Sequence, residues 1–425
     1  MIKFKQKTLT NGIRLITAPL QNTEAVTILV LVGIGGRFEP KDKLGISHFL
    51  EHLFFKGTKK YPTAQELSQE LDTLGANYNA FTGEEATGFF IHSSATDFEK
   101  SLDILSDMYL NPIFPEKEAL KEKNVIIEEA NTRRDVPQVH VQVLSQRQMF
   151  PDSPLGLDFI GTPETLAGIS RDDLNNYFKN GYNGASTIIA ICGNPKGHNW
   201  EKEIISRFTA KPKGSRPECE MVADTNIKEQ ISSEIRKVDQ ATFILSVRLF
   251  KKTDPRRYQA TILRTILGGG MSSRLFREVR EKRGLCWYIQ AATDCYFDTG
   301  LISVSAGVKT DKLGEAVQTI MTEINDLKKN GPTKDELRRA KSQLRGQIAL
   351  SLEGSQEIAS YLAEEIQYEN KVRQPEDIIR EINKITARDI RNLTREVFVS
   401  DKMGLAVIAP KIDQAGLEKI IKNGS

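Results

Sequence analysis

The sequence predicts an α+β protein of two similar domains, in which each domain is an antiparallel-rich sheet packed with helices. Strand and helix patterns alternate in blocks, and the two halves of the chain repeat the same order of elements. In the first half a strand at 88–94 leads into a helix that opens at 96–97. In the second half a strand at 299–306 leads into a helix that opens at 310–311.

A stretch rich in Pro, Gly and basic residues lies almost at the midpoint of the 425-residue chain, at 211–217. It shows no apolar periodicity, which is typical of a linker. The predicted domains are therefore residues 1–210 and 221–425, with a linker at 211–220. Each has about the size that supports its own hydrophobic core.

Composition excludes several classes of protein. Hydrophobic residues make up 39% and charged residues 27%, and 59 Lys and Arg against 56 Asp and Glu leave a net charge of +3. This balance argues against nucleic acid and against an anionic membrane surface as partners. The longest apolar run, 25–34, has about half the length of a membrane-spanning helix. The four cysteines form no C-x-x-C pair and no secretory signal is evident, so we expect a reducing, cytoplasmic location.

Local signals define the elements of the first half. Asn11-Gly12 predicts a tight turn between two strands, followed by a strand at 25–33. Apolar residues at helical spacing predict a helix from 46 to 54, and Thr63 with Glu66 predicts a capping box that opens a second helix. Strand composition over 77–93 and further helices at 97–110 and 116–133 complete the pattern.

The strongest chemical signal is His48-Phe-Leu-Glu51-His52 on the first predicted helix. Positions i, i+3 and i+4 fall within an arc of about 100° on an α-helix, so both imidazoles and the carboxylate emerge from one face. Two neutral imidazoles can hold a divalent metal, and a nearby carboxylate can take a proton from water. The alternative is a pair of surface histidines that water solvates.

A catalytic zinc site takes three protein ligands, so a third must come from another element. The helix at 116–133 carries Glu122, Ile126 and Glu129 on one face. Acidic groups amid apolar neighbours are costly to bury unless a cation compensates them. A solvated acidic face is the better interpretation for Glu128 and for Glu116 or Glu118.

His48 to His52, the following Leu-Phe-Phe-Lys-Gly-Thr at 53–58, and Glu122 to Glu129 downstream resemble the inverted-zincin metallopeptidases of the M16 family. The resemblance covers nearly the whole chain, including the repeated halves, and is greatest to the short bacterial members that work as dimers. It implies the LuxS/MPP-like metallohydrolase type of fold.

By this resemblance His48, His52 and Glu129 would bind one Zn2+ per chain, because the family's spacing places the third ligand at Glu129 rather than Glu128. Glu51 would be the general base that activates water and later protonates the leaving amine. Glu122 matches the acidic residue that supports the site. We class Glu51 and Glu122 together as catalytic residues.

Asn79-Ala80-Phe81-Thr82, with Glu85, resembles the family's edge strand, to which an extended substrate is added as another strand. An ordinary sheet strand is an equally good interpretation of these residues. We assign Asn79, Ala80 and Phe81 to substrate binding.

The second half has Leu-Gly-Gly-Gly-Met-Ser-Ser-Arg at 267–274 where the first half has its histidines. The segment that follows resembles the family's substrate-binding segment, in which an arginine precedes a tyrosine by seven residues. Arg280 matches the arginine, but Trp287 stands at the tyrosine position and Tyr288 comes one residue later. Because a one-residue offset in a strand moves a side chain to the other face, either the indole substitutes or the register shifts. A basic helix end whose aromatic residues pack into the core is the structural alternative.

These observations predict a zinc metalloendopeptidase that cleaves extended oligopeptides or unfolded segments. One chain carries both the zinc half and the Arg280 half, so we expect a homodimer that encloses a chamber. The first alternative is a non-catalytic assembly or binding protein with the same fold. The second is a catalytic subunit that requires a different partner chain.

Overall fold

The structure is a computed structural model that describes residues 1–223 and 227–423. The chain forms two compact units. Unit 1 comprises Met1–Asn131, Asp158–Glu220 and Ala349–Pro375, and unit 2 comprises Thr132–Leu157, Met221–Ile348 and Glu376–Ser425. Among the described residues, no helix combines the length and apolar character needed to cross a membrane.

Unit 1 is built on a six-stranded sheet with the order β1-β2-β6-β3-β5-β4. All neighbouring pairs are antiparallel except β2 and β6, which run parallel. The predicted hairpin is confirmed, because β1 pairs with β2 across a turn in which Gly12 has φ +86°. The strands are β1 (Lys5–Thr8), β2 (Arg14–Pro19), β3 (Ala25–Val32), β4 (Asn77–Thr82), β5 (Thr87–Ser94) and β6 (Thr187–Gly193).

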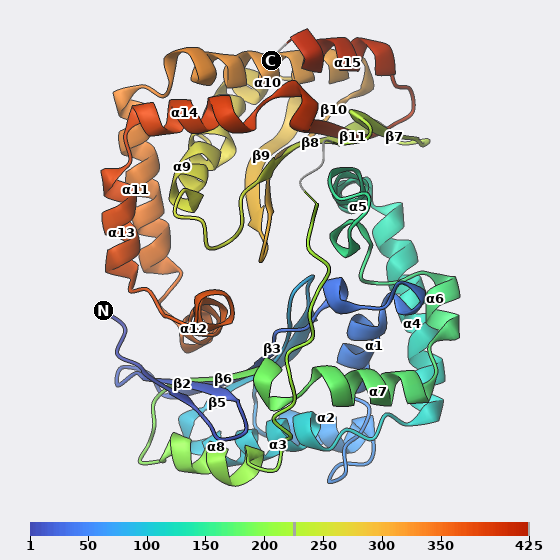
Figure 1. Cartoon of the computed structure of the whole chain (residues 1–425), viewed down its shortest axis with the longest axis vertical. Coiled ribbons are helices and arrows are strands. Elements are labelled where there is room, and N and C mark those ends of the chain that lie inside the picture. Colours follow the sequence, from blue (N-terminus) through green and yellow to red (C-terminus); the bar gives the residue numbers. More distant parts are fainter. Residues whose placement is uncertain (224–226, 424–425) are drawn as a thin grey trace. The chain divides into compact units, whose positions relative to one another are not determined.

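Helices cover both faces of this sheet (Figure 1). The predicted capping box is confirmed, since the Thr63 hydroxyl accepts from the Glu66 N–H and the Glu66 carboxylate accepts from the Thr63 N–H. The helices of unit 1 are α1 (Ile46–Leu53), α2 (Ala64–Thr73), α3 (Phe98–Leu110), most of α4 (Glu116–Asp135), α6 (Pro163–Gly168), α7 (Arg171–Gly181), α8 (Trp200–Phe208) and α12 (Ser355–Glu369).

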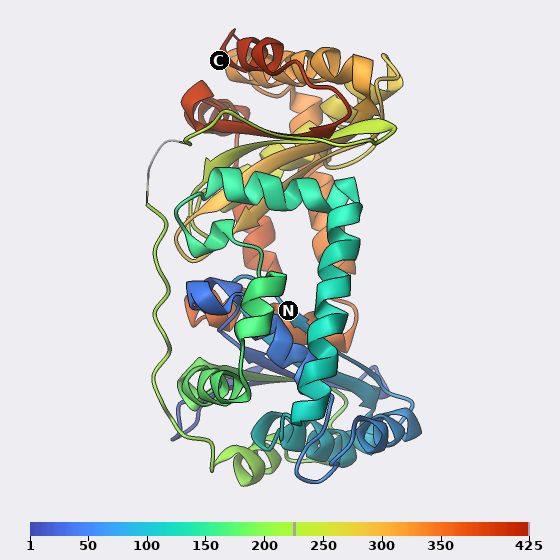
Figure 2. The same ribbon diagram turned by 90° about the vertical axis from the view of Figure 1, so that its right-hand side faces the viewer.

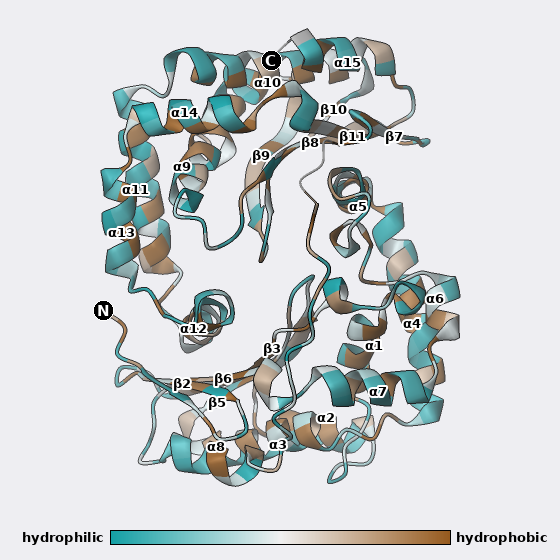
Figure 3. Cartoon of the chain, viewed as in Figure 1, coloured by the Kyte–Doolittle hydropathy of each residue, from teal (hydrophilic) through white to brown (hydrophobic). Residues whose placement is uncertain are grey.

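The central strands of unit 1 are buried on both faces, which explains their nearly continuous apolar sequence (Figure 3). Alternate residues of β3 point to opposite sides: Ile28 and Val30 pack toward the side of α1 and α3, whereas Leu29 and Leu31 pack against α12. Both sets of residues therefore need a helical layer to exclude water.

Unit 2 is built on a five-stranded sheet with the order β7-β11-β8-β10-β9, in which only β7 and β11 run parallel. Its strands are β7 (Ile231–Ile235), β8 (Gln240–Leu249), β9 (Cys286–Cys295), β10 (Gly300–Lys309) and β11 (Met403–Ala409). Its helices are α5 (Pro137–Met149), α9 (Arg257–Gly268), α10 (Leu313–Asn330), most of α11 (Lys334–Leu350), α13 (Pro375–Lys384), α14 (Ala387–Val397) and α15 (Gln414–Asn423). The predicted α+β fold with two helix-packed sheets is confirmed.

Each sheet takes one of its covering helices from the other half of the sequence. Helix α5, from the first half, lies across the sheet of unit 2 (Figure 2), where Val141 packs with Ile244 and Ile408. Helix α12, from the second half, packs on the sheet of unit 1. The domain limits expected from the sequence, 1–210 and 221–425, are continuous. They would place α5 in the first domain and α12 in the second, so the structure exchanges these two helices. The difference arises because an amphipathic pattern shows which face a helix buries but not which sheet receives it.

We predict that Leu362→Ala in α12 destabilises the protein by about 2–5 kcal/mol, because the side chain is 1% exposed and packs against the sheet of unit 1. Urea unfolding followed by circular dichroism measures this loss. The matched control is Ser360→Ala, at an exposed position of the same helix, with an expected effect within about 0.5 kcal/mol. Equal unfolding of the two variants would show that α12 does not stabilise this sheet.

Candidate metal centre and active site

A buried carboxylate fixes the start of the helix that carries the histidine motif. The two oxygens of Glu39 accept hydrogen bonds from the N–H groups of Gly45 and Ser47, each at 2.7 Å. Burial raises the pKa of Glu39 to about 7. Gly45 has φ +94°, and a Cβ there would lie 2.8 Å from the Ile160 carbonyl oxygen, so the entry to α1 requires glycine.

His48, His52 and Glu129 come together from α1 and α4. Glu129 Oε2 lies 3.7 Å from His48 Nε2 and 3.6 Å from His52 Nε2. One ligand atom from each of the three side chains lies within 4.8 Å of the others, and no other such group of His, Cys, Asp or Glu occurs in the described parts of the chain. Tetrahedral zinc with bonds of about 2.0–2.2 Å separates its ligand atoms by about 3.3–3.6 Å. The two distances to Glu129 lie close to this range, and two imidazoles with a carboxylate are a donor set that suits zinc.

Glu122 orients one of these histidines. His52 Nδ1 donates to Glu122 Oε2 at 3.0 Å, and the Lys56 ammonium lies 2.7 Å from Glu122 Oε1. With the proton on Nδ1, the lone pair of His52 Nε2 faces Glu129 and is available to a metal. Glu122 is buried, and the ammonium of Lys56 compensates its charge.

Glu51 lies between His48 and His52 in sequence, and a residue of strand β4 holds its side chain. Its Oε2 accepts a hydrogen bond of 2.8 Å from the Thr82 hydroxyl at the end of β4. Burial raises the pKa of Glu51, the hydrogen bond from Thr82 and the charge of His52 oppose the rise, and the charge of Glu129 adds to it. A carboxyl group with a raised pKa is suited to accept and return a proton near neutral pH.

Strand β4, which contains Asn79, Ala80 and Phe81, is the edge of the unit 1 sheet and pairs only with β5. The Ala80 N–H donates to the Asn79 side-chain oxygen at 2.9 Å. Phe81 is 43% exposed, and its ring covers Gly88 on β5. An added strand could pair at this edge once the Asn79 amide releases the Ala80 N–H.

Glu85, just after this strand, is an internal residue. Its carboxylate forms an ion pair with Arg37 at 2.6 Å and accepts from the Tyr368 hydroxyl at 2.9 Å. The Gln367 amide donates to the Glu85 carbonyl oxygen. These contacts join the β4–β5 turn to α12, so Glu85 has a structural role rather than one at the surface of the strand.

Arg280 belongs to unit 2 and lies in a π-helical turn, Phe276–Glu281, that leads into β9. Its guanidinium stacks over the ring of Phe276, 4.6 Å from the centroid. Short π-helical turns occur frequently at functional sites.

A β-bulge follows at Trp287. Gly307 of β10 pairs with Tyr288 and Val308 pairs with Cys286, so Trp287 is an extra residue in β9. Trp287 Nε1 and the Tyr288 ring each lie 2.6 Å from the position that a Cβ on Gly307 would occupy. Both side chains therefore lie over the same face of the sheet. The strict alternation assumed from the sequence does not hold here, because the bulge interrupts it.

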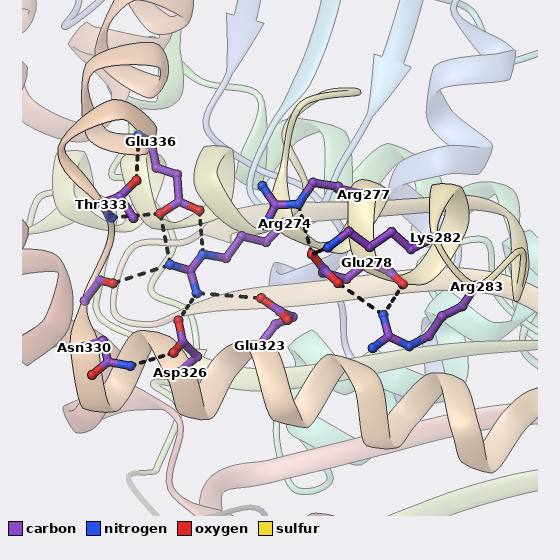
Figure 4. A network of polar contacts seen from close by, with 11 residues as sticks. Arg274, Arg277, Glu278, Lys282, Arg283, Glu323, Asp326, Asn330, Thr333 and Glu336 are labelled. Carbon is purple, nitrogen blue, oxygen red and sulfur yellow. Dashed lines mark hydrogen bonds and ion pairs between the residues drawn. The ribbon is translucent and has the colours of Figure 1, made fainter.

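The glycine-rich segment of unit 2, residues 267–274, is held by a different set of contacts, of which Figure 4 shows those of Arg274. Arg274 is buried and forms a bidentate pair with Glu336 of α11 at 2.8 and 2.9 Å, with a further hydrogen bond to Asp326. The Gln343 amide donates to the Gly269 carbonyl oxygen. An arginine and an amide thus join this segment to α11, where unit 1 uses histidines and carboxylates.

The structure brings together five of the predicted site residues in unit 1: His48, Glu51, His52, Glu122 and Glu129. Sequence reasoning missed three residues that contact this set or its helix, which are Glu39, Lys56 and Thr82. Helical spacing after His52 could have indicated Lys56, and the acidic residue before the helix could have indicated Glu39. No local signal connects Thr82 to Glu51.

Comparison with known proteins defines the class. Residues 14–163 match the family described as insulinase (peptidase family M16), and residues 168–344 match the M16 inactive domain. The chain is 32% identical to the uncharacterised zinc protease YmxG of Bacillus subtilis over 96% of this chain and 98% of that protein. It is 30% identical to an uncharacterised zinc protease of Streptomyces coelicolor, over 96% of this chain and 90% of the other. The chain belongs to the M16 family of peptidases.

Solved structures show the same fold. A protease from Helicobacter pylori has a TM-score of 0.88 at 23% identity, over 96% of this chain and 100% of the other. An M16 inactive domain from Pseudomonas fluorescens has a TM-score of 0.90 at 19% identity, over 97% and 100%.

We predict that Glu122→Ala weakens zinc binding about 10- to 100-fold, because His52 loses the acceptor that fixes its tautomer. Competition with a colorimetric chelator measures the affinity. Glu128→Ala, at an exposed position of the same helix, is the control and should retain the wild-type affinity. Equal zinc affinities for the two variants would show that Glu122 does not support metal binding.

Proposed function

We propose that this protein is a zinc metalloendopeptidase that hydrolyses peptide bonds in extended oligopeptides or unfolded segments. The observation that carries the proposal is the cluster of His48, His52 and Glu129, with Glu51 on the helix that bears the two histidines. The names of the relatives, which are called zinc proteases, support it.

His48, His52 and Glu129 would hold one Zn2+ per chain. When bound, this ion supplies Lewis-acid polarisation of the scissile carbonyl and lowers the pKa of the attacking water. His52 is held ready for this role by Glu122, which keeps its proton on Nδ1. Lys56 balances the charge of Glu122, so the ligands can remain close without a buried excess of negative charge.

Glu51 would act as the general base. Its carboxylate takes a proton from the attacking water and returns it to the amine of the leaving peptide, so one group serves in both steps. Thr82 fixes one of its oxygens, which leaves the other free to meet the water. Glu51 therefore accepts and donates the proton, whereas His48, His52 and Glu129 bind the ion.

The substrate would be added to β4 as an extended strand. Asn79, Ala80 and Phe81 would bind it through main-chain hydrogen bonds, which tolerate many side chains. Arg280, with Trp287 and Tyr288, would bind the substrate and stabilise charge on the scissile carbonyl. This assignment predicts broad sequence specificity.

The proposal extends to a homodimer that encloses a chamber, with a cytoplasmic location and peptides as the only other partners. It follows from a single chain that carries both the zinc half and the Arg280 half. A chamber would exclude folded proteins and admit extended peptides. Size-exclusion chromatography of the chain expressed alone, with peptidase assays on the same fractions, separates this proposal from a requirement for a different partner chain.

We predict that Glu51→Gln lowers the rate of peptide cleavage at least about 100-fold while the protein retains zinc, because the amide cannot accept a proton. Quenched-fluorescent peptides report the activity, and elemental analysis reports the metal. Chelation should remove wild-type activity, and added Zn2+ should restore it. The control Glu128→Gln should cleave at the wild-type rate. Undiminished cleavage by Glu51→Gln would overturn the mechanism, and zinc without cleavage in the wild type would favour a non-catalytic protein.

The bulge in β9 generates a separate prediction about the two aromatic residues. Trp287 Nε1 is turned toward Gly307, and burial raises the pKa of Tyr288 to about 12, so its hydroxyl stays protonated as a donor. We therefore expect Tyr288→Phe to lower kcat/KM about 10- to 100-fold and Trp287→Phe to change it less than about threefold. The reverse order would assign the donor to the indole.

A further inference from the structure

We infer that Thr82 is a positioning residue for Glu51: its hydroxyl fixes the carboxylate in the orientation that proton transfer requires. The inference rests on the proposed function, since it assigns Glu51 the role of the base. It adds a residue from a different element of the fold, the edge strand β4, to the groups that make the reaction possible.

The first step is the contact itself. Thr82 Oγ1 donates to Glu51 Oε2 at 2.8 Å, within the usual range for a hydroxyl and a carboxylate. Within residues 1–223 and 227–423, this is the only hydrogen bond that the Glu51 carboxylate accepts. The base is therefore oriented by a single polar contact.

The second step is the rigidity of the donor. Thr82 is the last residue of β4 and pairs directly with Thr87 of β5. The Thr87 hydroxyl donates to the Ile34 carbonyl oxygen, which ties this end of the sheet to the chain after β3. A β-branched residue also has few rotamers, so the hydroxyl is held by both its backbone and its side-chain geometry.

The third step is what Glu51 would do without this contact. A glutamate has three rotatable side-chain bonds, and the nearby carboxylate of Glu129 repels that of Glu51. A base must lie within hydrogen-bond reach of the proton it takes, and a displacement of about 1 Å can cost about 100-fold in rate. Removing the hydroxyl should therefore reduce turnover without changing substrate binding.

The test compares Thr82→Val, which keeps the shape and removes the donor, with Thr82→Ser, which keeps the donor. In the zinc-loaded full chain, Thr82→Val should lower kcat about 10- to 100-fold with KM within about twofold, and Thr82→Ser should retain most of the wild-type kcat. The control is Thr8→Val, at an exposed position of β1, which should leave both constants unchanged. A wild-type kcat for Thr82→Val, or an equal loss for Thr82→Ser, would overturn the inference.

A double variant separates positioning from a general structural effect. If Thr82 acts only through Glu51, the combination of Thr82→Val with Glu51→Gln should be no slower than Glu51→Gln alone. A further loss in the double variant would show that Thr82 acts by another route and would contradict the inference. If Thr82→Val does not fold, Thr82→Ala serves in its place.

A crystallographic readout does not depend on peptidase activity. The wild type should show one Glu51 conformer within hydrogen-bond distance of Thr82, and Thr82→Val should show several conformers or weak density for the carboxylate. A single unchanged conformer in Thr82→Val would contradict the inference even in an active enzyme. A wild type that binds zinc but cleaves no peptide would instead contradict the proposed function, while the comparison of conformers would still test Thr82.

Discussion

The burial of α1 and α4 in one apolar core is the constraint on which the site depends. The three candidate ligands come from two helices that are distant in sequence, and their atoms meet only if both helices are held in the core of unit 1. Phe49, Leu50 and Leu53 anchor α1 in the apolar core, and Ile126 anchors α4 in the same cluster. Glu122 then joins the helices at their polar side, through His52 and Lys56. Apolar packing sets the distance between the helices, and this carboxylate sets the orientation of the side chains.

The sequence was sufficient to predict the elements that depend on local chemistry. A turn residue with positive φ, a capping box and a helical repeat of apolar residues each determine a short segment, so the hairpin, α2 and α1 are as predicted. The motif from His48 to His52 belongs to the same class of signal, because a helix alone places its three polar groups on one face. Glu129 is different. Its selection over Glu128 depended on a family resemblance, and the structure agrees with it, since Glu129 Oε2 lies within 3.7 Å of both histidines whereas the neighbouring Glu128 is exposed.

The features that the sequence did not predict are those that depend on contacts between distant segments. Nothing near Thr82 indicates that its hydroxyl reaches Glu51, because the contact depends on how α1 packs beside the edge strand. The bulge at Trp287 has the same origin, since the register of β9 is determined by its pairing with β10. The exchange of α5 and α12 is the largest such feature. Two sheets with apolar faces can each accept an amphipathic helix, and contacts between distant segments determine which sheet the helix covers.

The exchange of α12 also has a consequence for how the protein is made. A ribosome releases the strands of unit 1 long before it reaches Ser355, so Leu29, Leu31 and Ile188 have no helix to cover them during roughly the second half of translation. The nascent chain therefore exposes an apolar sheet face until α12 has been synthesised. Chaperones that shield such surfaces would therefore matter more for this chain than for one whose two domains fold in the order of their synthesis.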